Sequence, residues 1–151
     1  MKDMYHKYFE DFQIGEKTIT RARQLEMADI RIYSACTSLC ARIHSDPFYC
    51  ESIPELGKIT IPYSLALNVI DGFFAQSISP EGVPTFHYGY DEVEYEEKIY
   101  PGDIIWSEFE LVDKQIKNED FGVLTFKATT YKQDKSVVIK HIDKLYCGRK
   151  H

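Results

Sequence analysis

The stretch "IPYSLALNVIDGFFAQS", Ile61 to Ser77, carries the strongest helical pattern in the chain. Pro62 stands at its start, where the fixed φ angle of proline suits the first turn of a helix. A helix that is apolar nearly all round is buried by a large sheet, or by a sheet and a partner. Asn68 and Asp71 are its only polar interior residues and should need hydrogen-bonding partners. We expect a central helix over Pro62 to Ser77 with these side chains buried: Leu65, Leu67, Val69, Ile70, Phe73 and Phe74.

After this helix, the pattern changes to that of β-strands. Polar and apolar residues alternate in four segments, which are separated by short turn signals such as "PGD" and "DK". The segments are "TFHYGYDEVEYEEKIY", "IIWSEFELVDKQIK", "VLTFKATTYKQ" and "SVVIKHIDKLYCG". Long strands joined by short turns pair antiparallel, so the last three segments predict a meander.

The first part of the chain is mainly helical. "EKTITRARQL" favours a modest strand at a sheet edge, and a helix is expected from about Met27 to Leu39. In "DPFYCESI", Asp46 is a good N-cap and Pro47 a good first helical residue, so a short helix is expected. The order of elements indicates an α+β fold, with an antiparallel sheet around one long helix. We expect a single domain over residues 1–151.

Composition supports a folded domain and excludes some partners. Hydrophobic residues make up 44% of the 151 residues, enough for a real core. The net charge of −6 repels nucleic acid phosphates, so we expect no nucleic acid partner. One anionic small molecule is still possible, since it needs only a local basic patch. No apolar run approaches the roughly 18 residues that span a bilayer, so no membrane association is expected.

The cysteines indicate neither zinc nor disulfides. No paired histidine and cysteine spacing accompanies them, so we expect no metal site. We expect reduced thiols that fill gaps in the core: Cys36, Cys40, Cys50 and Cys147. The first residues, "MKDMYHKYFEDF", lack the apolar stretch of a signal peptide, and a reducing cytoplasm is the expected compartment.

Several short stretches, taken in order, resemble one family. They are "YFEDFQIGE" (Tyr8 to Glu16), "ITRARQLEMADI" with Asp29, "IHSD" (Ile43 to Asp46), "YPGD" and "YKQDKSVV". In this order they resemble the MaoC-like dehydratases and (R)-specific enoyl-CoA hydratases of the hot dog fold. The resemblance implies an antiparallel sheet wrapped around a central helix, and pairing of sheets into a homodimer or a larger assembly of dimers. It implies water addition to, or removal from, acyl thioesters of coenzyme A, as in fatty acid metabolism.

The resemblance also implies a site. His44 occupies the histidine position of the family, and Asp46 could assist it as a second catalytic residue, although an N-cap role competes. Leu39 stands five residues before His44, where the family usually has its catalytic aspartate, and Ala41 stands where an asparagine is usual.

Beside the central helix the family often has His-Gly, with the glycine N–H facing the thioester. Here Pro62 and Tyr63 stand there; Tyr63 still offers an N–H, whereas proline has none. Substrate contacts are therefore expected from Leu39, Ile61, Pro62 and Tyr63. Coenzyme A, as part of the substrate, is the only cofactor-like group expected.

Other interpretations stay open. His44 could be the base, a relic in a site that only binds thioesters, or a structural residue. A hot dog thioesterase would use a carboxylate on the central helix, where Asp71 is the one candidate. A catalytically degenerate acyl-CoA-binding subunit is the third class. We expect a short or polar acyl group, with the coenzyme A phosphates near basic residues such as Arg42, Lys58 and Arg149.

The remaining histidines and the acidic run are expected to be peripheral. The run "DEVEYEEK" alternates with Val93 and Tyr95, which is typical of a solvated strand face. The histidines outside the family motif are expected at the surface or at a sheet edge: His6, His87, His141 and His151.

Overall fold

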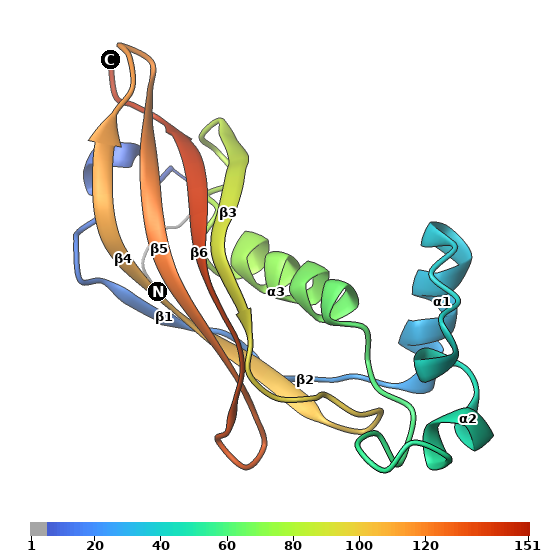
Figure 1. Cartoon of the computed structure of the whole chain (residues 1–151). Helices are drawn as coiled ribbons and strands as arrows, with labels where there is room; N and C mark the ends of the chain where they lie inside the picture. The colour runs from blue at the N-terminus through green and yellow to red at the C-terminus, as the bar shows by residue number, and fades with distance from the viewer. Residues whose placement is uncertain (1–5) are drawn as a thin grey trace.

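A curved antiparallel sheet wraps around one long helix in the computed structural model, which describes residues 6–151 (Figure 1). The sheet order is β1-β4-β5-β6-β3, and β2 pairs with the first two residues of β4. This confirms the expected α+β architecture. The elements are η1 (Phe9–Asp11), β1 (Lys17–Ile19), β2 (Arg23–Gln24), α1 (Met27–Thr37), η2 (Arg42–His44), α2 (Pro47–Glu51), α3 (Tyr63–Ser77), β3 (Thr85–Tyr95), β4 (Ile104–Ile116), β5 (Phe121–Lys132) and β6 (Val137–Gly148).

The predicted meander is confirmed in β4, β5 and β6, which pair antiparallel in chain order. The turn between β4 and β5 is closed by Asn118, whose side-chain oxygen accepts from the N–H groups of Asp120 and Phe121. At the start of β5, Gly122 lies against the ring of Phe9, and a Cβ there would meet that ring at 2.4 Å. The N-terminal segment can therefore pack on the sheet only because this position is glycine.

The predicted first strand is interrupted. The stretch from Lys17 to Gln24 forms two short strands, β1 and β2, along β4 rather than one. At the break, the Thr20 hydroxyl accepts from the Ser107 N–H and donates to the Arg21 carbonyl. This side-chain bonding replaces part of the regular ladder, which a local alternation pattern does not reveal.

Helix α3 carries the core. Its buried residues are Leu65, Ala66, Val69, Ile70, Phe73 and Phe74. The expectation of burial was wrong for Leu67, which is half-buried. Asn68 is exposed, and it has the expected hydrogen-bonding partner, because its side-chain amide donates to the Ser64 carbonyl. One sheet covers only part of the circumference of a helix, so some apolar residues of α3 lie at its margin. Asp71 has the expected partner, the Tyr90 hydroxyl.

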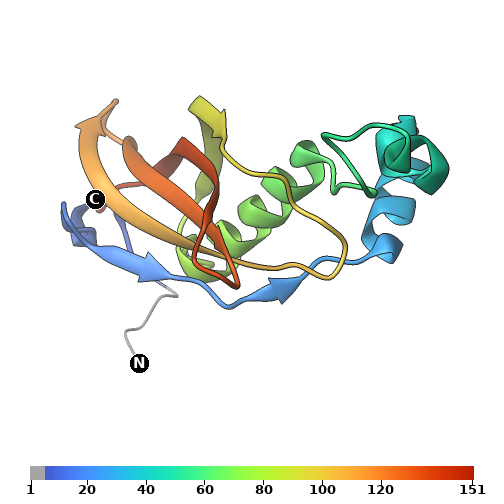
Figure 2. The ribbon, with the colours of Figure 1, turned by 60° about the horizontal axis from the view of Figure 1, so that its bottom comes forward.

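The two helices α1 and α2 lie beyond the N-terminal end of α3, away from the β4–β5–β6 meander (Figures 1 and 2). Helix α1 ends where Ser38 adopts a left-handed conformation with φ 61°. Helix α2 has the predicted N-cap, because Asp46 accepts from the Tyr49 N–H at 3.0 Å. The loop between β3 and β4 reaches toward the same region (Figure 2).

The cysteine prediction was right for two residues and wrong for two. Cys50 and Cys147 are buried thiols, whereas Cys36 and Cys40 are exposed. Cys36 lies on α1, which projects away from the sheet and so buries little of its surface. Within residues 6–151, no helix is long and apolar enough to span a membrane.

Candidate active site

A cavity of about 330 Å³ opens at the N-terminal end of α3. It is formed by the segment after α1, by η2, by the segment leading into α3 and by the β3–β4 loop. Most of its lining is apolar: Leu39, Ile43, Leu56, Ile61, Tyr63 and Ile99. Its polar members are His44, Thr60, Ser64 and Lys98. An apolar hollow with a few convergent polar groups is the usual form of a small-molecule site.

Backbone hydrogen bonds hold the walls of this cavity together. The Ile61 N–H donates to the Ile99 carbonyl at 2.7 Å, which ties the entrance of α3 to the β3–β4 loop. The Thr60 N–H donates to the Ile43 carbonyl at 3.1 Å, which ties the same segment to η2. Residues that lie far apart in the chain are thereby fixed around one space.

The orientation of His44 is set by one of these segments. Its Nδ1 lies 2.7 Å from the Thr60 carbonyl oxygen. A carbonyl only accepts, so Nδ1 carries the proton and, in the neutral ring, Nε2 holds the free lone pair. Nε2 forms no hydrogen bond with any residue in the described part of the chain, 6–151. His44, which lines the cavity, therefore has Nε2 as the ring atom that is free to accept a proton.

The start of α3 supplies hydrogen-bond donors to the same cavity. The first N–H groups of a helix have no partner within it, and they carry the positive end of the helix dipole. Here the N-cap is Pro62, which provides no side-chain acceptor, so the Tyr63 and Ser64 N–H groups keep their donor capacity. The Tyr63 ring stacks on Tyr95 at 4.3 Å between centroids, and burial raises the pKa of its phenol.

The structure brings five of the expected site residues to this cavity: Leu39, His44, Ile61, Pro62 and Tyr63. Asp46 is not among the residues that line it. One Asp46 oxygen caps α2, and the other accepts two bonds from the Arg42 guanidinium, at 2.7 and 3.1 Å. These Arg42 bonds, followed by the Tyr49 N–H, hold the pKa of Asp46 below its usual range. The competing N-cap interpretation of Asp46 is therefore the one that its contacts support.

Lys98 is the basic residue that lines the cavity, and sequence reasoning missed it. Lys98 is the last residue of the stretch "DEVEYEEK" and lies just after β3, and its ammonium group donates to the Glu55 carbonyl. Of the three basic residues considered, Arg42 and Lys58 lie close along the chain to His44 and Thr60. Arg149 instead binds Glu10 and the Asn118 carbonyl at the opposite end of the sheet (Figure 1).

The prediction for His141 was wrong. His141 is 2% exposed and Asp143 is fully buried, because the residues of β6 that alternate with Lys140 and Ile142 point into the interior. His87 is partly exposed, but its Nε2 lies 3.2 Å from an Asp143 oxygen. The acidic residues of β3 are exposed, as expected for a solvated strand face.

No family model and no curated protein sequence matches the chain. Solved structures do match it. A monoamine oxidase regulatory protein from an Archaeoglobus species superimposes with a TM-score of 0.88 at 26% identity, over 95% of each chain. A MaoC-like dehydratase from Rhodospirillum rubrum gives 0.82 at 18% identity, over 95% of this chain and 98% of its own. The (R)-hydratase PhaJ1 from Pseudomonas aeruginosa superimposes with a TM-score of 0.80 at 15% identity, over 95% of this chain and 87% of its own.

The chain therefore has a hot dog fold. A Mycobacterium tuberculosis protein described as having a double hot dog fold also matches, and this chain spans 44% of the length of that protein. Its structural neighbours are MaoC-like dehydratases and (R)-hydratases, as the sequence motifs implied.

Proposed function

We propose that this protein is a hydratase or dehydratase acting on a 2-enoyl or 3-hydroxyacyl thioester of coenzyme A, with His44 as its base. The observation that carries the proposal is the bond from His44 Nδ1 to the Thr60 carbonyl, which leaves Nε2 as the acceptor beside the start of α3. Hydration needs a base for the attacking water and donors for the thioester oxygen as negative charge develops there. Both kinds of group meet at this cavity.

The chemistry can be written with the groups at hand. Water loses a proton to His44 Nε2 as its oxygen bonds to Cβ of the substrate, and the electrons of the double bond move toward the thioester oxygen. In this proposal the N–H groups of Tyr63 and Ser64, two residues that line the cavity, would stabilise that enolate. The imidazolium then returns a proton to Cα, which restores the thioester and the neutral base. None of the described residues that line the cavity is an aspartate or a glutamate, so His44 carries both transfers.

The size and lining of the cavity agree with a short acyl thioester. Its volume lies at the lower end of the roughly 300–1,000 Å³ of ligand sites, so most of the coenzyme A would lie outside it. Lys98 in the lining, with Arg42 and Lys58 nearby along the chain, is positioned to attract the anionic part of the substrate. No cofactor besides this coenzyme A moiety enters the proposal.

The Leu39 side chain favours one competing class, a subunit that binds acyl-CoA without turning it over. The thioesterase class has less support, because Asp71 lies about two turns beyond Ser64 along α3 and does not line the cavity. Assays with crotonyl-CoA and acetyl-CoA as substrates distinguish the hydratase, the thioesterase and the binding subunit. Loss of the enoyl absorbance without free thiol identifies a hydratase, and thiol release identifies a thioesterase. Saturable binding with neither product identifies the binding subunit.

Replacing Leu39 with aspartate is expected to raise the rate of hydration by up to about 10²-fold, the lower end of what one positioned acid or base contributes. Leu39 is half-buried at the cavity, so a carboxylate there stays partly solvated. Its backbone is held by the Ser34 and Thr37 hydroxyls, so the change is local. Turnover of crotonyl-CoA measures the effect. Leu39→Asn is the control of equal shape, and equal rates for the two variants would contradict the prediction.

We also propose at least a homodimer. Strand β3 ends the sheet, and within residues 6–151 no strand pairs with its outer edge. Exposed aromatic residues such as Phe86 and Tyr88 lie on β3. Pairing with a second copy would cover this edge. Light scattering at micromolar concentration should give a mass of twice 17.6 kDa or a larger multiple. A monodisperse monomer would refute this prediction.

A further inference from the structure

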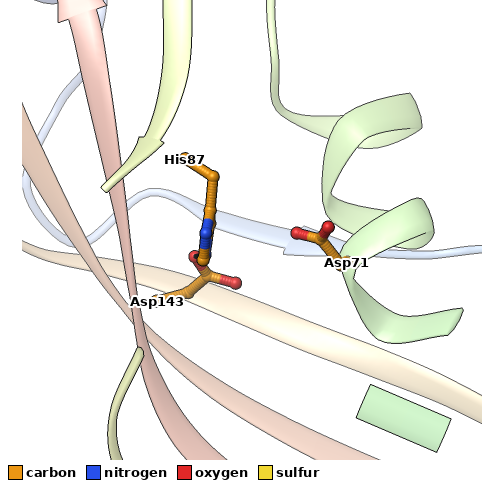
Figure 3. Close-up of side chains that lie close together, drawn as sticks. All are labelled: Asp71, His87 and Asp143. Carbon is orange, nitrogen blue, oxygen red and sulfur yellow. Dashed lines mark hydrogen bonds and ion pairs between the residues drawn. The ribbon is translucent and has the colours of Figure 1, made fainter. Parts of the chain in front are cut away.

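A second group of reactive side chains lies apart from the His44 cavity. Asp71 of α3, His87 of β3 and Asp143 of β6 converge between the helix and the sheet (Figure 3). Their ligand atoms all lie within 4.8 Å of one another, and none of the three residues lines the cavity. Three elements from distant parts of the chain thus direct one imidazole and two carboxylates at a common point.

The spacing suits shared coordination. His87 Nε2 lies 3.2 Å from Asp143 Oδ1. Two ligands about 2.1 Å from a metal ion are separated by about 3.0 to 3.4 Å at an octahedral or tetrahedral edge. Asp71, on the other side of the group, is half-buried, and its carboxylate lies within 4.8 Å of the ligand atoms of His87 and Asp143.

Each carboxylate is oriented by a further neighbour. The Tyr90 hydroxyl donates a hydrogen bond to Asp71. His141 Nε2 lies 3.4 Å from Asp143 Oδ2. Ligating carboxylates in metal sites are held by hydrogen bonds of this kind.

The two carboxylates of the group have no lysine or arginine partner in the described part of the chain. Asp143 is fully buried, yet within residues 6–151 no lysine or arginine forms an ion pair with Asp71 or Asp143. His141 is fully buried and points into the group, but its Nδ1 has no partner among the described residues. Within residues 6–151, the ion-pair partners of Asp143 are therefore the two histidines alone, and Asp71 has none.

We propose that Asp71, His87 and Asp143 bind one divalent transition metal ion, such as Zn²⁺, Co²⁺ or Mn²⁺. One imidazole with two carboxylates suits these ions better than Mg²⁺ or Ca²⁺, which prefer oxygen ligands alone. His87 is 36% exposed, which gives the ion a route in and leaves positions for water. The ion would join α3 to β3 and β6, and this inference stands independently of the proposed hydratase activity.

Titration of EDTA-treated protein with CoCl₂ and ZnCl₂, followed by visible absorption and calorimetry, tests the proposal. We expect one equivalent per chain. Loss of a hydrogen bond to a ligand typically weakens metal binding about 10- to 100-fold, so Tyr90→Phe should lower the metal affinity by about that factor. His87→Gln and Asp71→Asn each remove a ligand, so they should lower the affinity further. His151→Gln is the matched control. It removes a second histidine–aspartate pair, His151 with Asp120 at 3.3 Å, for which residues 6–151 supply no third ligand, and metal binding should be unchanged.

Two results would overturn the proposal. One is the absence of saturable binding by the wild-type protein. The other is binding that persists in His87→Gln and Asp71→Asn, which would place the ion elsewhere. Asp143→Asn is avoided as the main test, because Asp143 is fully buried and its loss could unfold the chain. The side chains of His87 and Asp71 are at least partly exposed, so these variants are expected to fold, and circular dichroism should show the wild-type spectrum for each of them.

Discussion

His44→Ala is expected to lower the turnover of a 2-enoyl-CoA substrate by about 10²- to 10⁴-fold, the usual contribution of one general acid–base group. Nε2 is the acceptor that the cavity offers for the proton of water, and alanine removes it. Because the cavity lining holds no carboxylate in the described chain, no neighbour can take over the proton. The loss should therefore appear in kcat rather than in KM. The initial rate of crotonyl-CoA hydration, measured over a range of substrate concentrations, gives both constants.

The same substitution should change stability little. His44 is half-buried, and within residues 6–151 its side chain forms hydrogen bonds with Thr60 alone, so the loss is about that of one hydrogen bond, roughly 1 kcal/mol. Asp46→Asn is the matched control two residues away. Asparagine is as good an N-cap as aspartate, so both fold and turnover should stay near wild type. Full activity in His44→Ala would refute the catalytic role, and a large loss in Asp46→Asn would return Asp46 to the mechanism.

Phe74→Ala is expected to lower the free energy of unfolding by about 3–5 kcal/mol. Phe74 is 2% exposed on α3 and meets Phe109 of β4 and Phe126 of β5 edge to face, each at 5.1 Å between ring centroids. Alanine would leave a cavity at the contact between the central helix and the middle of the sheet, where the two neighbouring rings have little freedom to collapse. Urea denaturation followed by circular dichroism measures the difference.

Leu67→Ala on the same helix is the comparison. Leu67 is only half-buried, so its truncation should cost clearly less than that of Phe74. A loss below about 1 kcal/mol for Phe74→Ala would contradict the packing described here. An unexpectedly large loss for Leu67→Ala, dependent on protein concentration, would instead indicate that a second copy of the chain covers that side of α3.

The sequence alone determined the elements whose signals are local. Proline at the start of α3, the N-cap Asp46 before α2, and the alternation and turns of β4, β5 and β6 all act within a few residues, and each is present in the structure. The order of short motifs also indicated the family of folds. That resemblance also implied that His44 and the start of α3 belong to one site, and both line the same cavity.

Other features were decided only by the tertiary structure. Lys98 reaches the cavity because the β3–β4 loop is bonded to Ile61, a contact over a long separation in sequence. Cys36 is exposed because α1 projects beyond the sheet, although its sequence is compatible with burial.

The group at Asp71, His87 and Asp143 depends on the fold most of all. In β6 the alternation shows that His141 and Asp143 share a face with Ile139 and Leu145, but a strand with both polar and apolar residues on one face does not reveal which face is buried. That choice is made by the pairing of β6 with β3 and by the packing of α3 above them. Such pairings join residues far apart in the chain, and local patterns carry no information about them.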